Sequence, residues 1–276
     1  MSAIADVIYC YDETFEGLLC CVFESYAAKE LPYNICTMDE PQSSLLPLKE
    51  IVTDTVKAER VAASIPKKIG YSALELVQKA FLTCLPDKEL QILRFLRKGY
   101  RFGPSMLNFA GDETVHELTT AVKHLDKESH LLKGFIRFTV QKNILVSTIG
   151  PKNYVLPFLA HHFSERYPEE HILIYDTVHS MALVYRPYES AIIPMNAFCM
   201  MPPDAKEQKF RQLWQTFYDS IEIKPRHNEK CRMTLMPKRY WKYMTEFART
   251  SGCGMTRTEE TNTATGIDKE TKRIEG

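Results

Sequence analysis

Three cations and three large aromatic side chains stand together in the segment 236–243, whose sequence is MPKRYWKY. Cations hold phosphate groups and aromatic rings stack on nucleobases, so this composition suits a nucleic-acid surface. Because Pro237 can occupy the first turn of a helix, the alternative is an ordinary amphipathic helix with its rings inward and its lysines outward. The candidate nucleic-acid-binding residues of this segment are Lys238, Arg239, Trp241 and Lys242.

A second basic group is predicted on a helix from Asp87 to about Lys98, which Gly99 ends. Its cations project within about 100° of one another, opposite its large apolar residues. A further helix, from about 113 to 131, repeats this two-faced pattern with histidines and lysines. Solvated cations explain either helix taken singly, and one shared basic surface requires the fold to bring the segments together. The candidates from this group are Arg94, Arg97 and Arg101.

The junction around residues 130–138 combines rings and cations as well. Residues 135–140 alternate as a strand does, so Phe135 and Arg137 are expected on one strand face, with a stacking ring beside a cation. An ordinary helix–strand junction is the alternative. The candidates here are Lys133, Phe135 and Arg137, and Arg166 joins them from a helix predicted over about 157–166.

Four residues are weak candidates for acid or base catalysis: Asp12, Glu16, His130 and His162. Asp12 and Glu16 flank a strand-to-helix turn, where capping and the helix dipole stabilise carboxylates without any catalytic role. No Walker loop, Rossmann glycine fingerprint, nucleophile elbow or H-E-x-x-H helix is present. The sequence therefore favours a protein whose chemistry a partner supplies, although its own enzymatic activity stays an open alternative.

A metal site or an intrinsic cofactor is not expected. His161, His162, Glu165, Asp176 and His179 come nearest to a ligand set, but adjacent helical histidines diverge by about 100° and cannot easily bind one ion. The eight cysteines include no C-x-x-C pair and no C-x-x-x-C-x-x-C triad of the kind that holds an iron–sulfur cluster.

The formal net charge of the 276 residues is zero, but the charge is unevenly distributed. Residues 1–60 contain four Lys or Arg against eleven Asp or Glu, while residues 61–110 contain eight against three. Such separation creates local fields that can orient an anionic partner. No signal peptide opens the chain, and no apolar run approaches the roughly 20 residues of a membrane span. We expect a cytoplasmic protein without a membrane partner.

Periodicity predicts an α+β fold in which helices pack on a mostly antiparallel sheet built from strand pairs separated by helices. We expect one interleaved domain over residues 1–249, helical over about 56–132 and strand-rich over about 133–195, and a disordered tail over 250–276. A helix starting at Asp204 has apolar residues on one face, from Phe210 to Ile221, that are predicted to face the core.

Seven short motifs follow one another along the chain: D-x-x-F-x-G at 12–17, V-F-E-x-Y at 22–26, K-A-E-R-V at 57–61, K-G-F-x-R-F at 133–138, V-L-P at 155–157, H-F-x-x-R-Y-P at 162–168 and M-P-K-R-Y-W-K at 236–242. In this order they resemble an uncharacterised bacterial family labelled probable DNA-metabolism protein. The resemblance covers roughly residues 6–248.

The resemblance implies a role in DNA metabolism without assigning catalytic residues. Family members are typically encoded beside a DNA-modification or DNA-repair radical-SAM protein, and elsewhere the domain is fused ahead of a uracil-DNA-glycosylase-like domain. We therefore expect a DNA-repair or DNA-modification accessory protein that binds DNA, with a partner carrying the iron–sulfur cluster and S-adenosylmethionine. The alternatives are an enzyme acting directly on damaged bases or nucleotides, and a protein–protein adaptor that docks through its acidic first 60 residues.

Overall fold

The computed structural model describes residues 4–37, 45–109 and 111–247, and the tail predicted over 250–276 lies outside them. The helices are α1 (Phe15–Ala27), α2 (Thr55–Lys68), α3 (Tyr71–Phe81), α4 (Lys88–Phe102), α5 (Glu113–Phe135), α6 (Leu156–Arg166), α7 (Ala205–Ser220) and α8 (Glu229–Leu235), with 3-10 turns η1 (Gly103–Asn108), η2 (Lys224–Arg226) and η3 (Lys238–Tyr243). The strands are β1 (Ile4–Tyr11), β2 (Leu31–Thr37), β3 (Leu48–Glu50), β4 (Thr139–Gln141), β5 (Ile144–Ile149), β6 (His171–Asp176), β7 (Met181–Arg186) and β8 (Glu189–Pro194).

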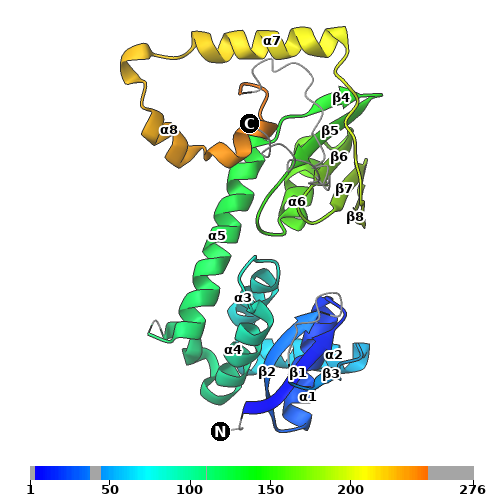
Figure 1. Ribbon diagram of the computed structural model, residues 1–276, viewed down its shortest axis with the longest axis vertical. Coiled ribbons are helices and arrows are strands. Elements are labelled where there is room, and N and C mark those ends of the chain that lie inside the picture. Colours follow the sequence, from blue (N-terminus) through cyan, green and yellow to red (C-terminus); the bar gives the residue numbers. More distant parts are fainter. Residues whose placement is uncertain (1–3, 38–44, 110, 248–276) are drawn as a thin grey trace, which may run out of the picture.

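Two lobes share one long helix (Figure 1). The N-terminal lobe consists of β1–β3, α1–α4 and the first half of α5, and the C-terminal lobe consists of the second half of α5 and the elements after it. Leu118 and Val122 of α5 belong to the core of the N-terminal lobe, whereas Leu125 and Leu132 belong to the core of the C-terminal lobe. The same helix is therefore a structural part of both hydrophobic cores.

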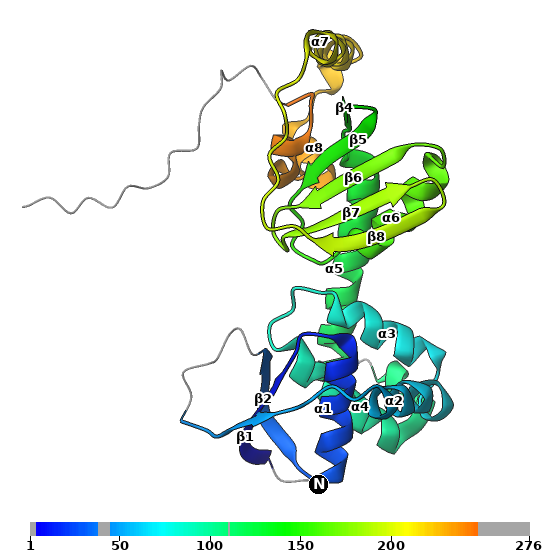
Figure 2. The same ribbon diagram turned by 90° about the vertical axis from the view of Figure 1, so that its right-hand side faces the viewer.

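The α+β prediction is confirmed, but the mostly antiparallel sheet is wrong. The N-terminal sheet has the order β2-β1-β3 and is parallel throughout. The C-terminal sheet, β4-β5-β6-β7-β8, is mixed because β5 and β6 run parallel. In each lobe one helix connects the parallel neighbours: α1 connects β1 to β2, and α6 connects β5 to β6. Such a crossover helix returns the chain to the edge where the first strand began, so the next strand runs in the same direction. Figure 2 shows this second sheet with α5 and α6 behind it.

Three local predictions fail where tertiary contacts override sequence pattern. Residues 135–140 are not one strand: α5 continues to Phe135 and β4 begins only at Thr139. The ring of Phe135 packs at 5.6 Å from that of Tyr240, and this contact favours the last helical turn. The C-terminal aromatic segment forms the short 3-10 turn η3 instead of a longer helix.

The apolar face of α7 does not face the core, contrary to the sequence prediction. Phe210, Leu213 and Phe217 are 58%, 64% and 52% exposed. The helix instead contacts the lobe through polar groups: the indole of Trp214, which belongs to the predicted apolar face, donates to Glu246, and the amide of Gln215 donates to the carbonyl of Thr245. Amphipathic periodicity predicts which residues share a face but not where that face points.

In the part of the chain that the structure describes, no helix combines the length and the apolar character needed to cross a bilayer.

Candidate nucleic-acid interface

The predicted nucleic-acid-binding residues divide between the two lobes. Arg94, Arg97 and Arg101 project from α4 in the N-terminal lobe. The remaining eight belong to the C-terminal lobe: Lys133, Phe135, Arg137, Arg166, Lys238, Arg239, Trp241 and Lys242. What each residue contacts decides whether its side chain is available to a ligand.

Arg97 is held by its own lobe. Its guanidinium donates to the hydroxyl of Ser25 and to the carbonyl of Glu30 at 2.8 Å, and it lies 5.0 Å from the centre of the Tyr26 ring. These bonds tie α4 to the end of α1. Arg94 is half-buried and Arg101 is exposed on the same helix.

Arg137 and Arg239 are paired with buried carboxylates. Arg137 forms a bidentate ion pair with Glu246, with distances of 2.7 and 3.2 Å, and lies over the Trp214 ring. Arg239 lies 2.9 Å from Glu128 of α5. Each pair joins residues more than 100 positions apart, so both arginines serve at least to hold η3 and its neighbours in place.

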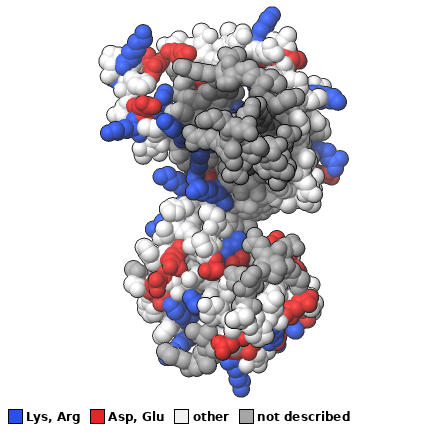
Figure 3. Space-filling model, in the orientation of Figure 1, with Lys and Arg blue, Asp and Glu red and all other residues white. Residues whose placement is uncertain are grey.

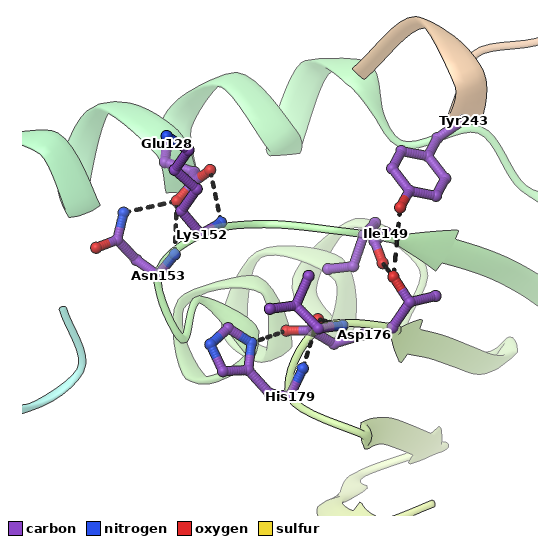
Figure 4. A network of polar contacts seen from close by, with 9 residues as sticks. Glu128, Ile149, Lys152, Asn153, Asp176, His179 and Tyr243 are labelled. Carbon is purple, nitrogen blue, oxygen red and sulfur yellow. Dashed lines mark hydrogen bonds and ion pairs between the residues drawn. The ribbon is translucent and has the colours of Figure 1, made fainter. Parts of the chain in front are cut away.

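Glu128 is the centre of a polar network at the middle of α5 (Figure 4). It accepts hydrogen bonds from the backbone amides of Lys152 and Asn153, from the Asn153 side chain and from the Tyr240 hydroxyl. Burial by itself disfavours the carboxylate, but these donors outweigh it and lower the pKa of Glu128. The network fixes the loop after β5 and η3 against α5.

The predicted stacking rings of the C-terminal lobe are packed against protein. Trp241 stacks on Phe247, with ring centres 4.4 Å apart and planes inclined by 11°, and its indole donates to the carbonyl of Met236. Phe135 packs in the core beside Tyr240. Neither ring presents both faces to solvent.

Four of the predicted binding cations in the C-terminal lobe carry no ion pair with a described residue: Lys133, Arg166, Lys238 and Lys242. Figure 3 shows lysine and arginine side chains gathered where α8 and η3 meet α5, just above the waist of the molecule. Burial is the main cause that lowers the pKa of His162. The positive charges of Lys133 and Arg166 lower it further, so both cations lie near the His162 ring.

The acid–base candidates divide between the start of α1, which carries Asp12 and Glu16, and the helices α5 and α6, which carry His130 and His162. Asp12 accepts hydrogen bonds from Thr14 and, at 2.8 Å, from the Thr53 hydroxyl. Partial burial opposes ionisation, but these bonds outweigh it and lower the pKa of Asp12. Such a carboxylate positions the start of α1, where Thr14 is the N-cap residue. Glu16 and His130 are exposed, on α1 and α5.

The histidines and acids considered as metal ligands do not converge. The buried carboxylate of Asp176 accepts a hydrogen bond from the His179 ring at 2.7 Å (Figure 4), whereas His161 pairs with Glu165 on α6 at 3.5 Å. Within residues 4–37, 45–109 and 111–247, no three His, Cys, Asp or Glu side chains are grouped to hold a metal ion.

The structure assembles a surface that the sequence analysis did not identify, on α1, α2 and α4. Along it, cations lie over aromatic rings: Lys57 and Arg60 over Phe23 at 5.4 and 5.9 Å, Lys68 over Tyr100 at 5.7 Å, and Arg101 over Phe102 at 5.2 Å. We call this surface the cation–aromatic face, and define it as Phe23, Tyr26, Tyr100, Phe102, Lys57, Arg60, Lys68, Arg97 and Arg101.

Two hollows of about 390 and 780 Å³ open on the cation–aromatic face and share Tyr26 and Tyr100 in their walls. Among the residues that the structure describes, no Asp or Glu lines either hollow. Tyr26 is 43% exposed and Phe102 is 46% exposed. Burial raises the pKa of Tyr26 and Tyr100, so both rings stay neutral at pH 7. Exposed rings beside cations are the arrangement on which nucleobases stack while phosphates are neutralised.

Sequence reasoning missed this face because its members come from three helices that are distant in the chain. α2 was predicted as a helix, but its cations Lys57, Arg60 and Lys68 have no aromatic neighbour in sequence. The signal in the sequence was the presence of the aromatic residues Phe23 and Tyr26 on α1 together with basic residues on the other helices.

The comparisons with known proteins identify a family. A family model described as a domain of unknown function, DUF4130, matches residues 86–246, from the start of α4 to the end of the C-terminal lobe. No curated protein matches the chain.

Proposed function

This chain belongs to the DUF4130 family, and we propose that it is a nucleic-acid-binding accessory protein of DNA repair or DNA modification. In this proposal it holds a single strand of DNA on the cation–aromatic face. A radical-SAM partner, bound at the same time, supplies the iron–sulfur cluster and the S-adenosylmethionine chemistry.

The observation that carries the proposal is the pairing of exposed rings with unpaired cations. Arg60, Lys68 and Arg101 make no ion pair with any described residue, so no carboxylate in the described part of the chain competes for them. The rings lie at the surface of hollows rather than on a flat helix, which suits unstacked bases better than a duplex. The link to DNA repair and to the radical-SAM partner comes from the family resemblance of the sequence motifs.

A fluorescence-anisotropy titration with a labelled single-stranded oligonucleotide tests the DNA-binding part. We expect the triple variant Arg60→Gln/Lys68→Gln/Arg101→Gln to weaken binding at least tenfold and to flatten its salt dependence. Each lost phosphate contact removes roughly 0.7 from the log–log slope, so the slope should fall by about 2. The matched control is Lys67→Gln/Lys123→Gln/Lys127→Gln, three helical cations outside the face.

If the triple variant retains the affinity and the salt slope of the native chain, this face is not the nucleic-acid interface. A loss that is equal in the control variant would reduce the effect to net charge. For the partner, we expect the neighbouring radical-SAM protein to co-purify with the chain after nuclease treatment, and its absence would contradict the accessory role.

A further inference from the structure

A second pocket, in the C-terminal lobe, has the chemistry of an anion site. It has a volume of about 320 Å³ and lies between β5, the segment 200–203, α7 and η3. Figure 2 shows the β4–β5 end of the sheet next to α7. The wall of this pocket contains three cations, Arg137, Arg211 and Lys242, and no Asp or Glu among the described residues. An anion entering this pocket meets cations, and no described carboxylate lines it.

The pocket opens at an unpaired part of the sheet edge. β4 pairs with β5 only from Gln141↔Ile144 to Thr139↔Val146. Beyond Val146, no described strand adjoins β5 on that side, and both Ser147 and Thr148 line the pocket. An edge that is not covered by another strand leaves polar groups available to a ligand.

Ser147 contributes a hydroxyl group to this wall. The residue is 2% exposed and lines the pocket. Its hydroxyl is not a fully buried atom without a partner, since among the described side chains only the Arg232 Nε is of that kind. A serine hydroxyl in a pocket wall can donate a hydrogen bond to a ligand oxygen.

The cations differ in how much of their bonding capacity is used. Arg137 is neutralised by Glu246. Arg211 forms an ion pair with Glu207 at 2.9 Å and donates to the Thr139 hydroxyl at 2.6 Å, and three of the five N–H donors of its guanidinium make no hydrogen bond with a described residue. Lys242 has no ion pair with a described residue and lies 4.7 Å from the centre of the Tyr243 ring. Arg211, Lys242 and Ser147 thus contribute a guanidinium, an ammonium group and a hydroxyl as hydrogen-bond donors to the lining of one pocket.

We propose that this pocket binds the terminal phosphate of a phosphomonoester, either at the 5′ end of a DNA strand or on a nucleotide. A phosphate dianion accepts several charge-assisted hydrogen bonds, which matches the donors of Arg211, Lys242 and Ser147. Met200, Met201 and Pro202 add apolar side chains to the lining. The proposal is independent of the cation–aromatic face, because the two sites lie in different lobes.

The test uses two matched ligand pairs with the full chain: a 12-mer oligonucleotide with a 5′-phosphate or a 5′-hydroxyl, and deoxyadenosine monophosphate or deoxyadenosine. We expect the phosphorylated member of at least one pair to bind tenfold or more tightly, as measured by calorimetry. A preference confined to the oligonucleotide identifies a strand end, and a preference within both pairs identifies the nucleotide itself as sufficient.

Two pocket variants and two controls complete the design. Lys242→Gln and Ser147→Ala should each reduce the phosphate preference about tenfold, the range for hydrogen bonds to charged groups. Lys238→Gln, on the same turn but outside the pocket lining, should keep the preference. The Arg60→Gln/Lys68→Gln/Arg101→Gln variant should also keep it, so failure of the proposed DNA interface is distinguishable. Equal binding within both pairs, or a preference unchanged in both pocket variants, overturns the proposal.

Discussion

The carboxylate of Glu128 and the guanidinium of Arg239 lie 2.9 Å apart and join the middle of α5 to a turn 111 residues later in the chain. Glu128 is 2% exposed, whereas the Arg239 side chain is 41% exposed. The carboxylate is thus the buried member, and it depends on its other donors as well as on the arginine.

We expect Glu128→Gln to destabilise the protein by about 3 kcal/mol at neutral pH, because an amide cannot accept the same set of hydrogen bonds. The folded-state pKa of Glu128 is lowered below the ordinary value of 4.5. Its contribution is therefore complete above pH 4.5 and is lost as the pH falls through the folded-state pKa. Urea denaturation at both ends of this range should show the difference between variant and native chain shrinking in acid.

Glu59→Gln, an exposed carboxylate on α2, is the control for the Glu128 experiment. It should change the free energy of unfolding by less than about 0.5 kcal/mol at any pH. A Glu128→Gln difference that stays constant from neutral to acidic pH would contradict the assignment of a lowered pKa.

Arg97 and Arg101 are one helical turn apart on α4, but only the substitution of Arg97 should lower the stability of the protein clearly. Arg97→Gln removes the bonds to Ser25 and Glu30 and should cost about 2 kcal/mol of stability. Arg101→Gln should change stability by less than about 0.5 kcal/mol. Urea denaturation of both variants tests the split, and equal losses would show that Arg101 is also structural.

The exposed apolar face of α7 predicts that polar substitutions on it change the stability of the protein little. Phe217→Ser should lower the free energy of unfolding by less than about 1 kcal/mol, because the Phe217 side chain is already half in water. Phe95→Ala, at a fully buried position of α4, should cost about 3–5 kcal/mol. Thermal denaturation of the two variants compares them directly, and a large loss in Phe217→Ser would mean that this face is covered in solution.

Gly17 tests the close approach of α1 to the Asp12 turn. A Cβ at Gly17 would lie 2.2 Å from the Asp12 carboxylate and 2.9 Å from the Thr53 hydroxyl. Gly17→Ala should therefore break the bond between them and cost about 1–3 kcal/mol. Gly134→Ala, where nothing lies within 4 Å of the new Cβ, should stabilise α5 by up to about 1 kcal/mol. A neutral Gly17→Ala in urea denaturation would contradict this packing.

Local sequence pattern predicted most elements because helical and strand periodicity act over a few residues. The helix predicted over about 157–166 and the helix predicted to start at Asp204 are examples. Strand direction was not predictable from the strands themselves, since it follows from the helices that connect them. The end of α5 at Phe135 depended on Tyr240, a contact that no local window contains.

The functional surfaces were less predictable for the same physical reason. Whether a cation is free depends on its distant carboxylate, and neither Glu246 nor Glu128 is near its arginine in sequence. Arg137, Arg239 and Lys242 are all cations that could bind a phosphate. Only the fold shows that Arg137 and Arg239 are neutralised by carboxylates. The cation–aromatic face likewise exists only after α1, α2 and α4 have packed.

The 23 residues of α5 form one uninterrupted rod of roughly 35 Å. Because both ends of α5 are packed into a hydrophobic core, the helix keeps a constant distance between a ligand bound in one lobe and a ligand bound in the other. Because α5 contributes to both hydrophobic cores, we expect the two lobes to unfold together. A single calorimetric transition, with no half-molten species, is the signature of such a shared backbone.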